Sequence, residues 1–224
     1  MLKTSLMLAA FLVSMAVSAA RGQEYSVEVI DASPDAGGVS AELVKQFQDK
    51  GVRIKRGSNR TICEVWFCRQ WKTDAEFKAT QERLYPFVPG QLIGLLHLSR
   101  KGSDFRNQTV GSGWYTLRFG LQPVDGNHVG TSVTRDFLLM IDAKLDDPDK
   151  EWSVKDLLKT SAKAAGSSHP AMLCLQKSTE GPELSIRHEE QNDWWILHVP
   201  GTGIASEKAG DVPVDLIVVG HAAE

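Results

Sequence analysis

Residues 114–122 read Trp-Tyr-Thr-Leu-Arg-Phe-Gly-Leu-Gln, and this stretch decides the fold class. Every odd position from 115 to 121 carries a large apolar side chain, whereas the even positions from 116 to 122 carry Thr, Arg, Gly and Gln. Successive side chains of a β-strand point to opposite faces, so a period of two residues indicates a strand with one face in a core.

Similar short runs lie on both sides of this stretch. One short helix is expected over residues 40–47, and a second begins at Ser153, which forms a capping box with Asp156, and ends at Gly166. Further strands are expected at residues 25–30, 52–56, 61–71, 91–99, 136–143, 171–176, 183–188, 194–199 and 212–220. This spacing favours an all-β protein over βαβ units. The predicted fold is therefore mainly β: a single-domain antiparallel β-sandwich, jelly-roll-like or immunoglobulin-like, with two short helices.

The composition is that of an ordinary globular protein. The chain has 224 residues, 42% of them hydrophobic and 24% charged, and a formal net charge of −3. This balance provides no strong positive field for nucleic acid or an anionic membrane. No repeat, low-complexity tract or linker divides the chain, so we expect one domain over residues 21–224.

The first 20 residues have the pattern of an export signal. Lys3 supplies the positive start, an apolar run follows from Leu6 to Val17, and Ala19 and Ala20 are small residues suited to cleavage. The run is shorter than the roughly 20 apolar residues that span a bilayer, so an uncleaved anchor is the weaker alternative. We expect a secreted or periplasmic protein that does not associate with membranes once the signal at residues 1–20 is removed.

Export would place three cysteines, Cys63, Cys68 and Cys174, in a compartment where disulfides persist. Cys63 and Cys68 should point to opposite faces of one strand and should not bridge each other, although Cys174 could pair with either. The favoured interpretation is three buried thiols. The spacing matches neither a zinc site nor a redox motif.

Residues 122–130 form the densest polar cluster of the sequence, between two apolar strands. Asp125 and His128 could be ligands of a divalent metal or an acid/base pair, joined by His169 from the segment after the second helix. Arg135 could hold a carboxylate or a phosphate with two hydrogen bonds. These residues define the functional hypothesis for the 125–136 loop.

The favoured alternative for the same loop is structural. Asp125 and Asn127 flank a glycine, which is typical of a turn. In this interpretation His128 packs locally, while Arg135 and Asp136 close the next strand. His169 then belongs to a helix-exit turn, and no cofactor is required.

The acidic residues after position 145 and the tryptophans are also candidate binding sites, for calcium and for a sugar. The acidic residues Asp146, Asp147 and Asp149 lack the spacing of a calcium loop, so we expect a solvated turn. Some tryptophans could form a platform for a sugar ring, although core packing is the favoured role. The candidates are Trp114, Trp152, Trp194 and Trp195.

The central motif, YTLRxGxQPxDGNHxG over residues 115–130 followed by RDFLL over 135–139, resembles a group of uncharacterised secreted bacterial proteins. Residues 63–66, 169–171 and 217–220 extend the resemblance over most of the mature chain. It implies a shared fold and export, and it transfers no activity. It directs attention to Asp125, Asn127, His128, Arg135, Asp136 and His169.

The sequence contains no phosphate-binding loop, no zinc-binding HExxH helix and no GxSxG nucleophile motif. We therefore expect a non-catalytic binding or structural module. One alternative is a metal-assisted or acid/base enzyme that uses the 125–136 loop and His169, and another is a carbohydrate-binding module. The sequence does not identify the partner: a glycan or another small molecule is one candidate ligand, and no nucleic acid is expected.

Overall fold

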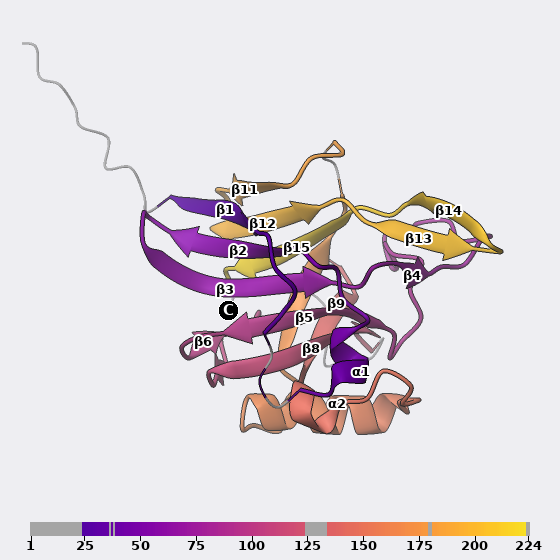
Figure 1. Cartoon of the computed structure of the whole chain (residues 1–224), viewed down its shortest axis with the longest axis horizontal. Helices are drawn as coiled ribbons and strands as arrows, with labels where there is room; N and C mark the ends of the chain where they lie inside the picture. Colours follow the sequence, from indigo (N-terminus) through magenta and orange to yellow (C-terminus); the bar gives the residue numbers. More distant parts are fainter. Residues whose placement is uncertain (1–23, 36, 38, 124–133, 179–180, 223–224) are drawn as a thin grey trace, which may run out of the picture.

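The computed structural model describes residues 24–35, 37, 39–123, 134–178 and 181–222. In this part of the chain, ten strands form one continuous antiparallel sheet in the order β1-β2-β3-β5-β8-β9-β10-β15-β12-β11 (Figure 1). Their bounds are β1 Tyr25–Ile30, β2 Gly51–Arg56, β3 Arg60–Phe67, β5 Leu92–Leu98, β8 Gly113–Leu121, β9 Asp136–Asp142, β10 Met172–Gln176, β11 Ser185–Glu189, β12 Trp194–Val199 and β15 Val214–Val219.

The sheet curls until its two edges approach each other. Tyr25 in β1 lies against Trp195 in β12, with ring centroids 4.9 Å apart, and β1 also contacts β11. The result is a nearly closed barrel. The predicted mainly β class with two helices is confirmed, but the predicted sandwich is wrong. The alternation of apolar and polar residues shows only that each strand has one face in a core. Two packed sheets and a single curled sheet both bury such a face, so the alternation does not distinguish a sandwich from a barrel.

The strand predicted over 114–122 is confirmed as β8. Its Leu117 lies opposite Met140 of β9, and Phe119 lies opposite Leu138, and all four side chains are buried in the main core. The other face of β8 is covered too, since Thr116 and Arg118 are buried. Strands β8 and β9 are therefore enclosed from both sides.

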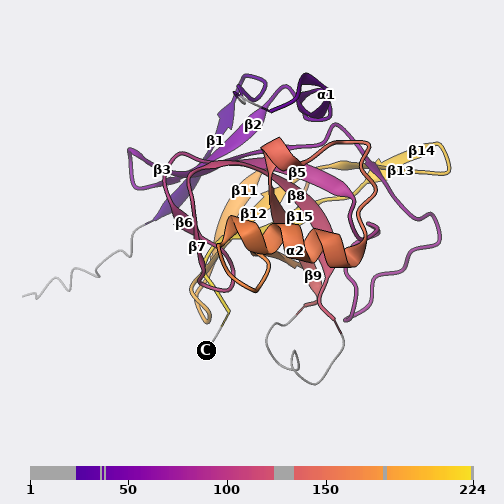
Figure 2. The same cartoon turned by 90° about the horizontal axis from the view of Figure 1, so that it is seen from below.

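Helix α2, Val154–Ala164, covers the outside of the barrel at β8 and β9 (Figure 2). The Ser153 side chain accepts a hydrogen bond from the Asp156 N–H, and Gly166, with φ of +60°, follows the helix end, as the capping signals predict. Helix α1, Ala41–Val44, is likewise capped by Ser40. Neither α-helix of the described residues has the length and hydrophobicity needed to cross a bilayer.

Several short elements have no counterpart in the sequence prediction. Strands β14 Lys208–Asp211, β13 Thr202–Ala205 and β4 Trp71–Lys72 form a small sheet, of which β13 and β14 project from the barrel in Figure 1. The predicted strand at 61–71 is divided, because β3 ends at Phe67 before β4 begins. Strands β6 Gly102–Ser103 and β7 Thr109–Val110 form a hairpin, and a short 3₁₀ turn, η1, follows β9 at Ala143–Leu145.

The three cysteines are free and buried, which confirms the favoured interpretation. Cys63 faces the barrel interior in register with Ile54 of β2. Burial raises the pKa of the Cys63 thiol and of the Cys68 thiol to about 12. Because only the thiolate reacts as a nucleophile, these groups should be inert in the folded protein.

The folded protein is therefore expected to resist a thiol reagent such as dithionitrobenzoate. A pKa of about 12 leaves roughly one thiol in ten thousand ionised at pH 8. Guanidinium chloride should expose all three thiols, and each should then react within minutes. Stoichiometric labelling of the native protein at Cys63 or Cys68 would contradict this expectation.

Candidate functional site

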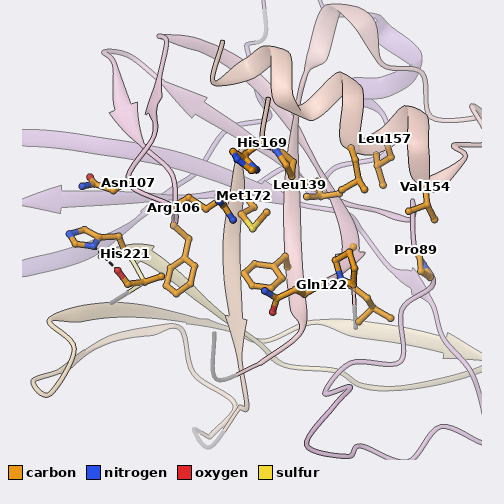
Figure 3. Close-up of a pocket in the computed structure, with 18 residues that line it drawn as sticks. Pro89, Arg106, Asn107, Gln122, Leu139, Val154, Leu157, His169, Met172 and His221 are labelled. Atoms are coloured by element: carbon orange, nitrogen blue, oxygen red, sulfur yellow. Dashed lines mark hydrogen bonds between the residues drawn. The ribbon is translucent and has the colours of Figure 1, made fainter. Parts of the chain in front are cut away.

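A cleft of about 450 Å³ lies on the outer face of the barrel beside α2 (Figure 3). Its lining combines side chains from β9 and β10, from α2, from the turn after β6 and from the segment that follows β15. The apolar part of this lining includes Phe105, Phe137, Leu139, Leu158 and Met172. Segments distant in the sequence thus meet in one hollow.

Strand parity explains why β9 contributes to the cleft. Phe137 and Leu139 point outward, whereas the intervening Leu138 points into the barrel core. Gly120 of β8 is paired with Phe137 and also lines the cleft. A Cβ atom at Gly120 would lie 2.8 Å from Leu139 Cδ1, so a larger residue there would push Leu139 out of place.

Asp104 fixes the wall of the cleft opposite α2. This residue is 1% exposed, and its carboxylate accepts hydrogen bonds from the backbone N–H groups of Arg106, Gln108 and Met172, at 2.8–3.1 Å. The Phe105 N–H also donates to the Met172 carbonyl at 2.8 Å. These contacts tie the turn to β10. The sequence interpretation missed Asp104, although Asp and Asn three positions apart are typical of a turn. In the structure, Asn107 of this turn has φ of 58°.

The polar groups of the cleft gather at one end. In Figure 3, Arg106, Asn107, His169 and His221 lie on one side, and Val154 lies at the opposite, apolar end. None of the described residues that line the cleft has a hydroxyl, thiol or carboxyl group in its side chain. This lining can therefore hold an apolar body and orient one polar group.

The predicted site residues divide into three groups. Asp125, Asn127 and His128 lie outside the described residues. His169 lines the cleft at its polar end, and Gln122, from the start of the predicted loop, lines the cleft as well. The structure therefore places His169 in the same hollow as one flank of that loop.

Arg135 and Asp136 lie elsewhere. The Asp136 side chain is buried, and its oxygens accept hydrogen bonds from the N–H groups of Leu84 and Tyr85 at 3.0 and 3.1 Å. Burial raises the pKa of Asp136, despite these two N–H groups. Arg135 Nε donates to the Gln122 carbonyl at 2.9 Å. Both residues thus hold neighbouring segments in place. Asp136 faces away from the cleft because it alternates with Phe137.

The described part of the chain contains no group of three His, Cys, Asp or Glu side chains that could hold one metal ion. Two of the three predicted ligands, Asp125 and His128, lie outside that part. A metal site that includes them with His169 stays a prediction.

The candidate tryptophans have other side chains packed on them. Trp194 is buried, and Trp114 is stacked with His97 at a centroid distance of 4.2 Å. Trp195 is stacked with His188 at 4.5 Å. Trp152 carries the Lys150 ammonium 3.6 Å from its ring centroid. A sugar platform needs one open ring face. These contacts cover one face of each half-buried ring, so the carbohydrate-binding alternative stays a prediction.

A Ser–His–Asp group, in which the histidine and the aspartate are buried, was also missed by the sequence interpretation, and it has the wrong geometry for a catalytic triad. His198 Nδ1 lies 2.6 Å from Asp215 Oδ1 and 3.3 Å from Ser178 Oγ, and Nε2 faces the Gly181 carbonyl. In a triad, the serine and the carboxylate occupy opposite ring nitrogens. Here both occupy Nδ1, so the group is structural.

No protein-family model matches the chain, and neither curated proteins nor solved structures provide a match. The class is therefore defined by fold and site alone: a nearly closed antiparallel barrel with an apolar cleft on its outer face. The resemblance of the central motif to exported bacterial proteins stays a prediction.

Proposed function

We propose that this protein is an exported binding module that takes a small, mainly apolar ligand with one polar or anionic group into the outer cleft. The observation that carries the proposal is the size and chemistry of the hollow. Ligand sites typically measure about 300–1,000 Å³ and combine an apolar lining with a few polar groups. The cleft of about 450 Å³ has both properties.

The arrangement of the lining predicts the orientation of the ligand. The apolar body would lie against Leu139 and Leu158, since these side chains form the part of the cleft nearest α2. The polar group would lie at the end formed by Arg106 and His169. A guanidinium offers charge-assisted hydrogen bonds, so an anionic group is favoured there.

The proposal is binding rather than turnover. Catalysis by a serine, threonine or cysteine nucleophile or by a carboxylate needs a hydroxyl, thiol or carboxyl group, which the described lining does not contain. His169 or His221 could transfer a proton only to or from a substrate atom held within hydrogen-bond reach of the ring. In the enzyme alternative, Asp125 and His128 would act together with His169.

A neutral fluorescent probe, N-phenylnaphthylamine, tests the cleft directly. Its fluorescence should rise and saturate with the wild-type protein. Leu158→Arg should weaken binding by about tenfold or more, which corresponds to about 1.4 kcal/mol, because it places a charge in the apolar lining. The matched control, Leu145→Arg, changes a residue that is 51% exposed and outside the cleft, and it should leave affinity unchanged.

Equal affinities of the two arginine variants would overturn the proposal, provided that both show the wild-type thermal transition. Loss of probe binding in both variants would also count against a specific cleft site.

A further inference from the structure

A further cavity, of about 320 Å³, opens at one end of the barrel, on the inner face of β9 and β10 rather than on the outer face that lines the α2 cleft. It is bounded by the β2–β3 turn, the residues after β5, the end of β15 and the start of β1. Figure 1 shows the β2–β3 turn and the end of β5 on the same side of the barrel, at the left. We call this cavity the barrel mouth.

The deep part of the barrel mouth is apolar. Leu96 and Leu98 of β5, Met140 of β9 and Leu173 of β10 line it, and all four side chains are buried. Cys63 of β3 lines it too, with a thiol that burial keeps protonated. The interior can therefore accept a hydrocarbon chain, which gains free energy by leaving water.

The rim of the barrel mouth is basic. Arg56 and Arg60 lie opposite each other at the end of the β2–β3 hairpin, and Arg100 and Lys101 follow β5. The described lining contains no Asp or Glu. Four cations thus surround one opening in a protein whose net charge is −3.

The rim cations differ from the other cations of β2 in their lack of an ion-pair partner among the described residues. Arg53 of β2 pairs with Glu64 at 2.7 Å, and Lys55 pairs with Glu28 at 3.2 Å. No residue of the described ranges forms an ion pair with a rim cation. Arg56 packs its guanidinium over the Tyr25 ring, 5.7 Å from the centroid, and its buried Nε donates to no described acceptor.

We propose that the barrel mouth binds a medium-chain aliphatic carboxylate, with the head group at the rim arginines and the alkyl tail among the interior leucines and Met140. Charge complementarity selects the anionic head, since an uncompensated basic rim attracts an anion and repels a cation. The small volume selects a single tail, because about 320 Å³ is at the lower end for ligand sites and too small for a two-chain lipid.

Isothermal titration calorimetry with dodecanoate at low ionic strength tests the proposal. Acetate carries the head group alone and dodecanol the tail alone, so neither should saturate the protein in the range where dodecanoate does. Affinity should rise by about fourfold for each methylene from octanoate upward, until the interior is filled.

The double variant Arg60→Gln/Arg100→Gln should weaken dodecanoate binding by at least about tenfold, because it removes two of the four rim charges. Both residues are exposed, so the variant should keep its thermal transition. The control Lys159→Gln/Lys208→Gln removes the same charge at exposed positions outside both cavities and should bind normally. All these titrations are made in the Leu158→Arg background, which blocks the cleft, because dodecanoate and dodecanol also fit the ligand proposed for the cleft.

Three outcomes would overturn the proposal. The first is equal binding of dodecanoate by the rim variant and its control. The second is binding of dodecanol as tightly as dodecanoate. The third is capture of anionic phosphatidylglycerol vesicles without binding of free dodecanoate, which would assign the basic rim to a membrane surface instead.

Discussion

Replacing Asp146 with alanine is expected to lower the free energy of unfolding by about 3–5 kcal/mol, because it removes one partner of a buried ion pair. Arg118 Nε lies 2.7 Å from Asp146 Oδ2, and the two side chains are 3% and 0% exposed. Without the carboxylate, the Arg118 charge would stay buried beside backbone carbonyls alone. The melting temperature should fall by on the order of 10 °C.

The rest of the network shows why the loss should be large. Asp146 also accepts hydrogen bonds from the Thr116 hydroxyl and, at 3.1 Å, from Trp152 Nε1. Arg118 donates its remaining hydrogen bonds to the carbonyls of Gly90 and Asp147, at 2.7 Å each. The network ties the outer face of β8 to the segments on either side of it.

Urea unfolding measures the effect, and Asp149→Ala is its control. Asp149 belongs to the same acidic stretch but is exposed, so its loss should change stability by less than about 0.5 kcal/mol. A double variant, Arg118→Met/Asp146→Leu, should recover much of the stability lost in Asp146→Ala, since an apolar pair leaves no charge unpaired. If Asp146→Ala and Asp149→Ala have the same free energy of unfolding, the Arg118–Asp146 ion pair does not stabilise the fold.

Replacing Asp215 with alanine is expected to lower the free energy of unfolding by about 3 kcal/mol. The Asp215 and His198 side chains are fully buried, and Arg187 lies against the second Asp215 oxygen as an ion pair that is not aligned as a hydrogen bond. His198 Nε2 lies against the Gly181 carbonyl, so the Asp215 carboxylate is the close partner of the other ring nitrogen, Nδ1, at 2.6 Å. Removal of the carboxylate leaves Nδ1 of that buried ring with the longer contact to Ser178 Oγ, at 3.3 Å.

A double-mutant cycle isolates this pair. The variants Asp215→Ala and His198→Ala should each destabilise, and the double variant should lose at least about 1 kcal/mol less than their sum. Asp211→Ala, at an exposed position of β14, is the control and should be neutral. Strict additivity of the two single variants would show that His198 and Asp215 do not stabilise each other.

Local patterns predicted the main strands well, and they failed where pairing is long-range. The strand at 194–199 coincides with β12, because Trp194 and the residues after it carry an apolar run bounded by turn residues. Strand β14 was missed because all four of its residues, Lys208–Asp211, are exposed and give no apolar alternation. Its pairing with β13 depends on a neighbour rather than on its own composition.

The acidic stretch shows that the burial of a single side chain can also depend on a distant residue. The sequence predicts that Asp146 is solvated, as Asp149 is, and this prediction is wrong for Asp146 alone. The residue that buries it, Arg118, lies 28 positions earlier on the outer face of β8. His198 likewise shows no sign in its own strand of the contact with Asp215, which comes from the register of β12 and β15.

The sequence by itself determined the mainly β class, the position of most long strands and the capped start of α2, because each follows from the geometry of a few consecutive residues. Only the tertiary structure decided that the sheet curls into one barrel, that His169 faces a cleft while Asp136 faces the core, and that four cations meet at the barrel mouth. Closure and convergence depend on strand twist and on register between distant segments, which no local period encodes.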